Sequence, residues 1–199
     1  MPISESGGIS TEAVLESAAR SQRPAGPAVR LISTASLSAQ EVVELADRVQ
    51  LTPEEEYVKQ ALRIVEPRIS DFRPTRSSGA GLYPYPVEGR SARSGVILKL
   101  EGVDVRLPIG TLGDGTWRIL GLALAMASTR GGILLVDEID TGLHYSVMEK
   151  MWRLVVDSAR RLGVQVFATS HSKDCYESLA AVAKPQRREE DSFVTIHRI

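Results

Sequence analysis

Two adjacent acids, Asp137 and Glu138, directly follow the apolar run Ile133–Val136. This short run predicts a buried strand, and a helical pattern follows it from about His144. Carboxylates at the end of such a strand can support a Mg²⁺ shell and orient an attacking water, which is the chemistry of nucleotide hydrolysis. That chemistry also requires groups that bind phosphate.

A second apolar run, residues 164–168, predicts another buried strand, and it is followed by Thr169, Ser170 and His171. In a parallel sheet the carboxyl ends of neighbouring strands meet at one edge, where ligands bind. We therefore expect these polar residues to lie beside the acid pair, with His171 placed to sense or stabilise a terminal phosphate. Each group has a simpler alternative, because strands often end in Asp-Glu and a histidine after a strand often caps a loop.

A glycine-bearing turn, LGDGT at residues 112–116, precedes an apolar helical pattern that extends to Ser128. Glycines permit turns that expose N–H groups at a helix N-terminus, where anions bind. Thr116 adds a hydroxyl, and Arg118 adds a charge in the first helical turn. The simpler alternative is a turn that leads into a buried helix.

These groups must be positioned by an alternation of strands and helices. Ser38 stands three residues before a glutamate, and so does Thr52, so both predict helix starts with capping boxes. Pro53 suits the first helical position. Gly163 suits a helix C-cap. The other predicted strands lie at 28–33, 133–136, 164–168 and 192–198, and a β-hairpin is predicted over 96–108 around Glu101-Gly102. The other predicted helices lie at about 144–162 and 173–183, and residues 71–94 are predicted to form a loop.

The alternation indicates an α/β domain with a parallel sheet covered on both faces. Residues 1–27 are rich in Ser, Gly, Ala and Pro, with a weak helical pattern at 11–20, and are expected to be a loosely held lead-in. Residues 28–199 are expected to form the folded domain.

The bulk composition favours a soluble cytoplasmic protein. The formal charge is -1 and 43% of residues are hydrophobic, which gives a real core and no global basic field for nucleic acid. The longest apolar run, residues 119–127, is too short to span a bilayer, and the N-terminus lacks a secretory signal pattern. A single cysteine, Cys175, excludes an internal disulfide. Nucleic acid as a partner has weak support from four arginines in the predicted loop, at 73, 76, 90 and 93.

Three segments in this order, LGDGTWRILGLALAMA, ILLVDEIDTGLHYSVMEKMW and VQVFATSHS, resemble the C-terminal half of ABC-type ATPases. They are most similar to the stand-alone AAA-type ATP-binding proteins found beside overcoming-lysogenization-defect nucleases, and the layout also occurs in structural-maintenance-of-chromosomes (SMC) proteins. The likeness is specific over about residues 107–175. It implies a P-loop NTPase-like parallel sheet flanked by helices, with an antiparallel hairpin before the signature helix, and Mg²⁺-dependent ATP hydrolysis.

The resemblance also implies a role for each matching residue. Asp137 resembles the Walker B aspartate that supports Mg²⁺ through water, Glu138 the general base, and His171 the switch histidine near the γ-phosphate. Residues 139–144, IDTGLH, resemble the D-loop at a dimer interface. The residues implied to contact nucleotide are Gly113, Asp114, Gly115 and Thr116 of the signature turn and Asp140 of the D-loop. Transporters carry LSGGQ where this chain has LGDGT, so direct phosphate contact by the acidic side chain is disfavoured while backbone amides can still serve.

The phosphate-binding P-loop, G-x-x-x-x-G-K-[ST], does not occur in the 199 residues, where no lysine follows a glycine. We therefore expect this chain to start partway through the fold, to bind ATP weakly or not at all, and to be inactive alone. A homodimer or a P-loop-bearing partner chain is expected, with sheet edges and apolar faces uncovered in its absence. The alternative function is a non-catalytic interaction or dimerisation module derived from the same fold.

Overall fold

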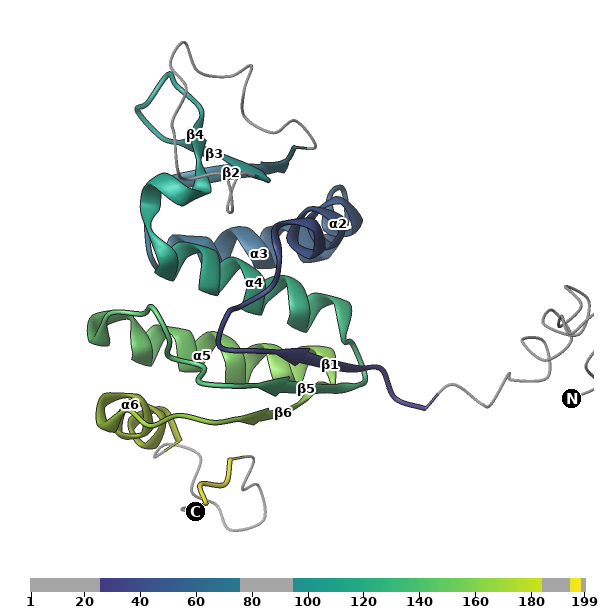
Figure 1. Ribbon diagram of the computed structural model, residues 1–199, viewed down its shortest axis with the longest axis vertical. Coiled ribbons are helices and arrows are strands. Elements are labelled where there is room, and N and C mark those ends of the chain that lie inside the picture. Colours follow the sequence, from purple (N-terminus) through teal and green to yellow (C-terminus); the bar gives the residue numbers. More distant parts are fainter. Residues whose placement is uncertain (1–25, 76–94, 184–193, 198–199) are drawn as a thin grey trace, which may run out of the picture.

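The computed structural model describes residues 26–75, 95–183 and 194–197. Within them, an antiparallel sheet lies at one end of the molecule, three helices follow it, and a parallel sheet with two more helices lies at the other end (Figure 1). The predicted α/β class is confirmed. The predicted lead-in falls outside these residues, except for residues 26 and 27, which belong to neither a helix nor a strand.

The parallel sheet contains three strands in the order β1-β5-β6. Their bounds are Val29–Ile32 for β1, Ile133–Val136 for β5 and Gln165–Ala168 for β6. The pairing places Leu31, Leu135 and Phe167 in one row across the sheet. The three predicted strands of this sheet are therefore confirmed to within a residue or so, and their carboxyl ends share one edge.

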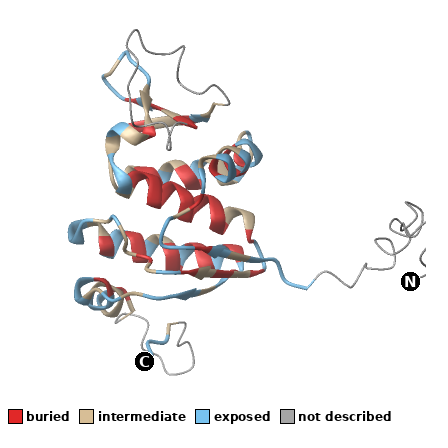
Figure 2. Ribbon diagram, viewed as in Figure 1, coloured by how far each residue is buried: buried red, intermediate tan, exposed pale blue. Residues whose placement is uncertain are grey.

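The prediction that helices cover both faces of this sheet is wrong for the described residues. The face that includes Leu134 and Val136 is buried, whereas the opposite face leaves Val29, Leu31 and Phe167 exposed at 62%, 61% and 53%. Figure 2 shows β1 and β6 largely in the colour of exposed residues. β6 is thus an edge strand and not the buried strand that its apolar sequence indicated. An apolar sequence shows that a strand favours burial, but it does not show that another element covers it.

The antiparallel sheet contains β2 (Ile69–Pro74), β3 (Val96–Leu100) and β4 (Leu107–Pro108). The predicted hairpin is confirmed as β3–β4, although Leu98 pairs with Leu107, so its connection is longer than a two-residue turn. β2 corrects part of the loop predicted from residue 71. A register shift between Ile69 and Asp71 breaks the alternation by which a strand is recognised in sequence. The rest of that loop, 76–94, lies outside the described residues.

Helices α2 (Ala39–Val49) and α3 (Pro53–Arg63) confirm two predicted starts but only one capping box. The Ser38 hydroxyl accepts from the backbone N–H of Glu41, whose carboxylate accepts in return from the N–H of Ser38. The second box is wrong. Thr52 donates its hydroxyl to the carbonyl of Val49, and Glu55 accepts from the N–H of Leu51, which has a left-handed φ of 62°.

Helix α4 (Asp114–Ser128) begins after a 3₁₀ turn, Ile109–Leu112, and contacts α2 and α3 on one side and α5 and β1 on the other. It is buried along most of its length (Figure 2), so it forms the centre of the core. No helix among the described residues is long and apolar enough to cross a membrane.

Helices α5 (Tyr145–Leu162) and α6 (Lys173–Ala183) pack against each other next to the parallel sheet. Gly163 ends α5 with a left-handed φ of 66°, as predicted. The predicted final strand is wrong over residues 194–197, which form no strand; its remaining residues lie outside the described part.

Candidate functional site

The carboxylate of Asp137 is exposed at the end of β5 and is held by hydroxyl groups from two neighbouring segments. The hydroxyl of Thr34, which follows β1, donates to Asp137 Oδ2 at 3.3 Å, and that of Thr169, which follows β6, donates to Asp137 Oδ1 at 2.8 Å. The backbone N–H of Asp137 also donates to the carbonyl of Ile32 at 2.8 Å. The ends of all three strands therefore orient this carboxylate.

Glu138 adopts a left-handed backbone conformation with a φ of 44°, which is uncommon for a residue with a side chain. Its N–H donates to the hydroxyl of Thr169 at 2.9 Å, and its carboxylate accepts from the hydroxyl of Thr141 at 3.1 Å. Thr169 thus contacts both acids. The left-handed backbone at Glu138 ends the extended conformation of the strand, and the two carboxylates have different hydroxyl partners, Thr34 and Thr169 for Asp137 and Thr141 for Glu138.

Arg118 lies beneath the acid pair, with only 3% of its surface exposed. Its guanidinium donates to the backbone carbonyls of Ser33 at 2.7 Å, Asp137 at 2.6 Å and Glu138 at 2.8 Å. Its position in the sequence predicted a charge available to an anion, but its donors are directed to these carbonyls. Burial lowers the pKa of the guanidinium below its ordinary value, and the charges of Asp140, Asp137 and Glu138 oppose that shift.

The glycine turn is placed at the N-terminus of α4, as predicted. Gly113 has a φ of 86°, and both it and Asp114 are exposed. Thr116 is buried, and its hydroxyl donates to the carbonyl of Leu112 at 3.1 Å, so that the side chain points into the helix. Among the four turn residues, the exposed backbone at 113 and 114 is the part open to a ligand.

The segment Ile139–His144 contacts this turn within the same chain. A side chain at Gly115 would bring its Cβ to 2.9 Å from the carbonyl oxygen of Gly142, so only glycine permits the observed approach. Asp140 lies in this segment, and its buried Oδ1 has no hydrogen-bond partner among the described residues. His144 has the simpler of its two expected roles, because its Nδ1 accepts from the N–H of Ser146 and caps α5.

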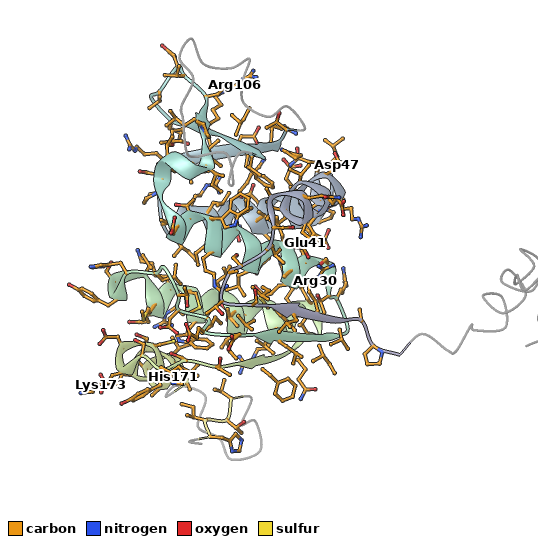
Figure 3. All side chains as sticks on the ribbon, in the orientation of Figure 1. Arg30, Glu41, Asp47, Arg106, His171 and Lys173 are labelled. Carbon is orange, nitrogen blue, oxygen red and sulfur yellow. The ribbon has the colours of Figure 1, made fainter. Side chains whose placement is uncertain are left out.

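His171 is exposed in the loop between β6 and α6, two residues after Thr169 (Figure 3). The hydroxyl of Ser170 accepts from the N–H of Ser172 at 3.0 Å and shapes this loop. The predicted acids and histidine therefore lie at the ends of adjacent strands on one edge of the sheet. Cys175, on α6, is buried, and this burial raises the pKa of its thiol, which is the behaviour of a packing residue.

Two residues of the site, Thr34 and Arg118, were not predicted to hold the acids. The first follows β1 as Thr169 follows β6, so the strand-end rule already applied to β5 and β6 would have found it. The second is a charged residue inside an apolar helical pattern. Such a position indicates burial with several partners, although it does not name them.

The donor set is compatible with Mg²⁺ bound largely through water and phosphate. No group of three or more His, Cys, Asp or Glu residues able to hold a metal occurs in the described part of the chain. Mg²⁺ sites in nucleotide hydrolases commonly use one or two carboxylates together with waters and substrate phosphates. An exposed carboxylate held by hydrogen bonds, such as that of Asp137, fits a Mg²⁺ site in which water and phosphate supply most of the ligands.

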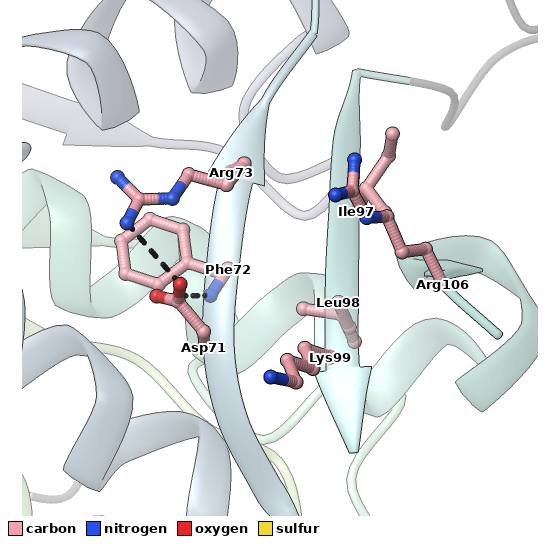
Figure 4. Close-up of a pocket in the computed structure, with 7 residues that line it drawn as sticks. All are labelled: Asp71, Phe72, Arg73, Ile97, Leu98, Lys99 and Arg106. Carbon is pink, nitrogen blue, oxygen red and sulfur yellow. Dashed lines mark hydrogen bonds and ion pairs between the residues drawn. The ribbon is translucent and has the colours of Figure 1, made fainter. Parts of the chain in front are cut away.

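A separate hollow of about 410 Å³ lies on the antiparallel sheet and is lined by residues of β2, β3 and the adjacent Arg106 (Figure 4). Arg73, the one described member of the predicted arginine cluster, forms an ion pair there with Asp71 at 3.2 Å. Arg76, Arg90 and Arg93 lie outside the described residues. The hollow shares no residue with the acid site.

Comparison with known proteins places these features in a family. Residues 10–174 match the family model described as "AAA domain, putative AbiEii toxin, Type IV TA system". The chain is also similar to a Helicobacter pylori protein named "ATP/GTP phosphatase", with 28% identity over 90 residues that make up 44% of this chain and 24% of that protein. The chain thus spans about a quarter of the length of this relative.

Among solved structures, the chain is similar to the SMC head domain from Thermotoga maritima, with 15% identity, a TM-score of 0.44 and coverage of 74% of this chain and 46% of that one. It is also similar to a structure described as "SmcHead bound to the C-winged helix domain of ScpA", with 13% identity, a TM-score of 0.44 and coverage of 70% of this chain and 43% of that one. The family match covers most of the chain. The chain therefore belongs to the AAA-domain family described as "AAA domain, putative AbiEii toxin, Type IV TA system" and carries an AAA-family ATPase domain.

Proposed function

We propose that this chain supplies the acid pair for hydrolysis of ATP by water to ADP and phosphate. The observation that carries the proposal is the arrangement at the end of β5, where hydroxyl groups from both neighbouring strand ends hold Asp137 and Glu138 follows in a separate orientation. Phosphoryl transfer depends mainly on positioning and on stabilisation of charge. A pair of carboxylates held by neighbouring hydroxyl groups, with Asp137 exposed and Glu138 half-buried, serves both needs.

In this proposal Asp137 supports Mg²⁺ through water, and Glu138 accepts a proton from the attacking water. Bound Mg²⁺ would neutralise charge that develops on the phosphate oxygens. His171 provides a hydrogen bond to the terminal phosphate from the adjacent strand end. The backbone of Gly113 and Asp114 provides N–H groups at the start of α4, and Asp140, in the segment that contacts this turn, adds a further contact to the nucleotide.

The phosphate cradle of the site is proposed to come from a P-loop-bearing polypeptide outside these 199 residues, or from a dimer that includes one. The sequence contains no P-loop, and Asp137 and Glu138 alone would repel a polyanion. The row of Leu31, Leu135 and Phe167, in which Leu31 and Phe167 are exposed, supports a missing layer, because parallel sheets are covered on both faces. A nucleic-acid partner has no comparable support, since Arg73 is ion-paired.

The alternative is a non-catalytic interaction module. The exposed apolar face of the parallel sheet, which carries Val29, Leu31 and Phe167 and is called the open face below, also favours this alternative. A domain that only binds a partner needs the fold and this apolar surface but not the acids. The two functions differ in one respect that can be tested: only hydrolysis depends on the carboxylate of Glu138.

The test uses the chain expressed in its native cells and isolated with whatever it binds. We expect the isolated assembly to release phosphate from ATP and Glu138→Gln to abolish that release without loss of partners. Glu149→Gln is the matched control, because Glu149 is an exposed glutamate on α5 whose carboxylate pairs with Arg153, away from the acid pair. Equal release by the wild type and the Glu138 variant would overturn the proposal and leave the interaction module.

A further inference from the structure

Arg118 connects three segments that come from distant parts of the sequence. It belongs to α4, whose first residues form the glycine turn, and its guanidinium reaches the end of β1 at Ser33 and the end of β5 at Asp137 and Glu138. Within the described part of the chain, its hydrogen bonds all go to backbone carbonyls. An arginine buried to this degree without a carboxylate in direct contact is rare, because removing its charge from water is costly.

The bonds to Asp137 and Glu138 are made at the peptide units where the chain leaves the strand. Glu138 is the residue with the left-handed φ of 44°, a conformation that costs free energy unless its surroundings hold it. One nitrogen of the guanidinium, Nη2, donates to both carbonyls at 2.6 Å and 2.8 Å. This pair of bonds is possible only while the two carbonyls converge, which is the geometry of the turned backbone.

We propose that Arg118 is a positioning residue that holds the Asp137–Glu138 backbone in its turned conformation and so sets the direction of the Glu138 carboxylate. The role in catalysis rests on the proposed function, whereas the role in holding the backbone does not. The planar fork of arginine suits it, since Nη1 bonds Ser33 while Nη2 spans the two acid carbonyls. A lysine retains the charge but cannot reproduce this divided geometry.

The backbone role is tested by hydrogen exchange of individual amides in the purified chain. The informative amides are those of Glu138 and Ile139, which donate to the hydroxyl and the carbonyl of Thr169. In Arg118→Met we expect both to exchange about tenfold faster or more, while amides in the middle of α4 and β5 keep the wild-type rate. Arg118→Lys should give an intermediate rate.

The matched control is Arg63→Met, because Arg63 also donates to a backbone carbonyl, that of Ile69 at 2.9 Å, away from the acids. It should leave the Glu138 and Ile139 amides unchanged. Faster exchange throughout α4 and β5 in the Arg118 variants would mean that the residue only stabilises the core, and this would overturn the proposal. Unchanged acid-pair amides in a folded variant would overturn it as well.

The wild-type chain allows a test without substitution. Three carbonyl acceptors should stop rotation of the guanidinium, so the Arg118 Nη protons should give separate, slowly exchanging NMR signals. A single averaged signal would contradict the proposal, whether or not the variants fold.

The role in catalysis is tested in the assembly isolated from native cells. Arg118→Lys should lower the turnover number by about tenfold to a hundredfold and leave the KM for ATP within about twofold, because Arg118 contacts the backbone of the base and not the nucleotide. A raised KM with unchanged turnover would overturn this role. A wild-type assembly without ATPase activity would refute the proposed function, and the amide exchange rates would still decide whether Arg118 holds the acid pair.

Discussion

The two sheets of this protein differ in how they are covered. In the antiparallel sheet, one face buries Ile69, Phe72 and Leu98, and the other carries polar and charged side chains such as Arg73 and Lys99. In the parallel sheet, one face is buried and the other is apolar and exposed, with Val29, Leu31 and Phe167 uncovered. The antiparallel sheet has the amphipathic pattern of a finished two-layer unit, whereas the parallel sheet has the composition of a central layer.

The difference shows where the protein needs another component. An apolar sheet face rarely remains in contact with water, because burying it is favourable by about 25 cal/mol per Å². The candidate site lies on the edge of this incompletely covered sheet, at the carboxyl ends of β1, β5 and β6. The open face requires a covering layer, and the acids require a phosphate cradle. A P-loop-bearing partner would supply both.

The largest expected effect comes from a pair of phenylalanines, one in each sheet. Phe72 is fully buried in β2, and Phe72→Ala should lower the free energy of unfolding by about 3–5 kcal/mol. Phe167→Ala should lower it by less than about 1 kcal/mol, since half of that side chain is already in water. Denaturant unfolding of both variants measures the comparison. Equal losses would mean that the chain itself covers the open face.

The next effect concerns the strand end that holds both acids. Thr169→Val removes a hydroxyl that donates to Asp137 and accepts from the N–H of Glu138, and should lower the free energy of unfolding by roughly 1–2 kcal/mol. Thr169→Ser keeps the hydroxyl and should stay within about 0.5 kcal/mol of the wild type. If the valine variant is as stable as the serine variant, these bonds do not order the acid pair.

A smaller effect is expected at the start of α2, which packs against the antiparallel sheet. Ser38→Ala should cost about 1 kcal/mol at neutral pH, because it removes the cap and one partner of Glu41. The hydrogen bonds from the Ser38 side chain and backbone lower the pKa of Glu41 below its ordinary value of 4.5. This contribution is present above pH 4.5 and is lost as the pH falls through the lowered pKa, so the difference between wild type and variant should shrink there. Thermal or denaturant unfolding at pH 7 and pH 3 measures it, and a difference that grows on acidification would contradict the assignment.

The smallest change in stability, with a visible change in association, is expected on the open face. Leu31→Lys should alter the free energy of unfolding by no more than about 0.5 kcal/mol and should reduce concentration-dependent self-association in sedimentation velocity. Leu51→Lys is the control, because Leu51 is 92% exposed in the turn between α2 and α3 and lies on no sheet. If both variants associate like the wild type, the open face does not mediate contact.

Much of the parallel half was predictable from sequence. The strand Ile133–Val136, the helix Lys173–Ala183 and the Gly163 cap were confirmed because apolar runs, helical periodicity and glycine each act locally. The shared edge of the acids and His171 followed from the strand-end rule. β2 was missed because its register shift hides the alternation of buried and exposed residues. The capping box predicted at Thr52 was wrong because the Glu55 carboxylate accepts from the N–H of Leu51 and not from that of Thr52.

Two aspects of the site were beyond local pattern. The direction of the Arg118 side chain depends on carbonyls that lie 85 and 19 residues away in sequence. An uncovered apolar face was expected from the missing P-loop lobe, but which side chains it exposes depends on the tertiary arrangement of the sheet and its helices. Both are tertiary facts, and both concern the region where the acids are held.

The most direct test of the central claim, that this chain carries the acids of an ATPase site without its phosphate cradle, is a calorimetric titration of the purified chain with Mg-ATP, with phosphate release measured in the same samples. We expect no saturable binding and no release, for the wild type and for Glu138→Gln alike. Saturable binding with phosphate release would contradict it, because a complete cradle would then have to form from these 199 residues.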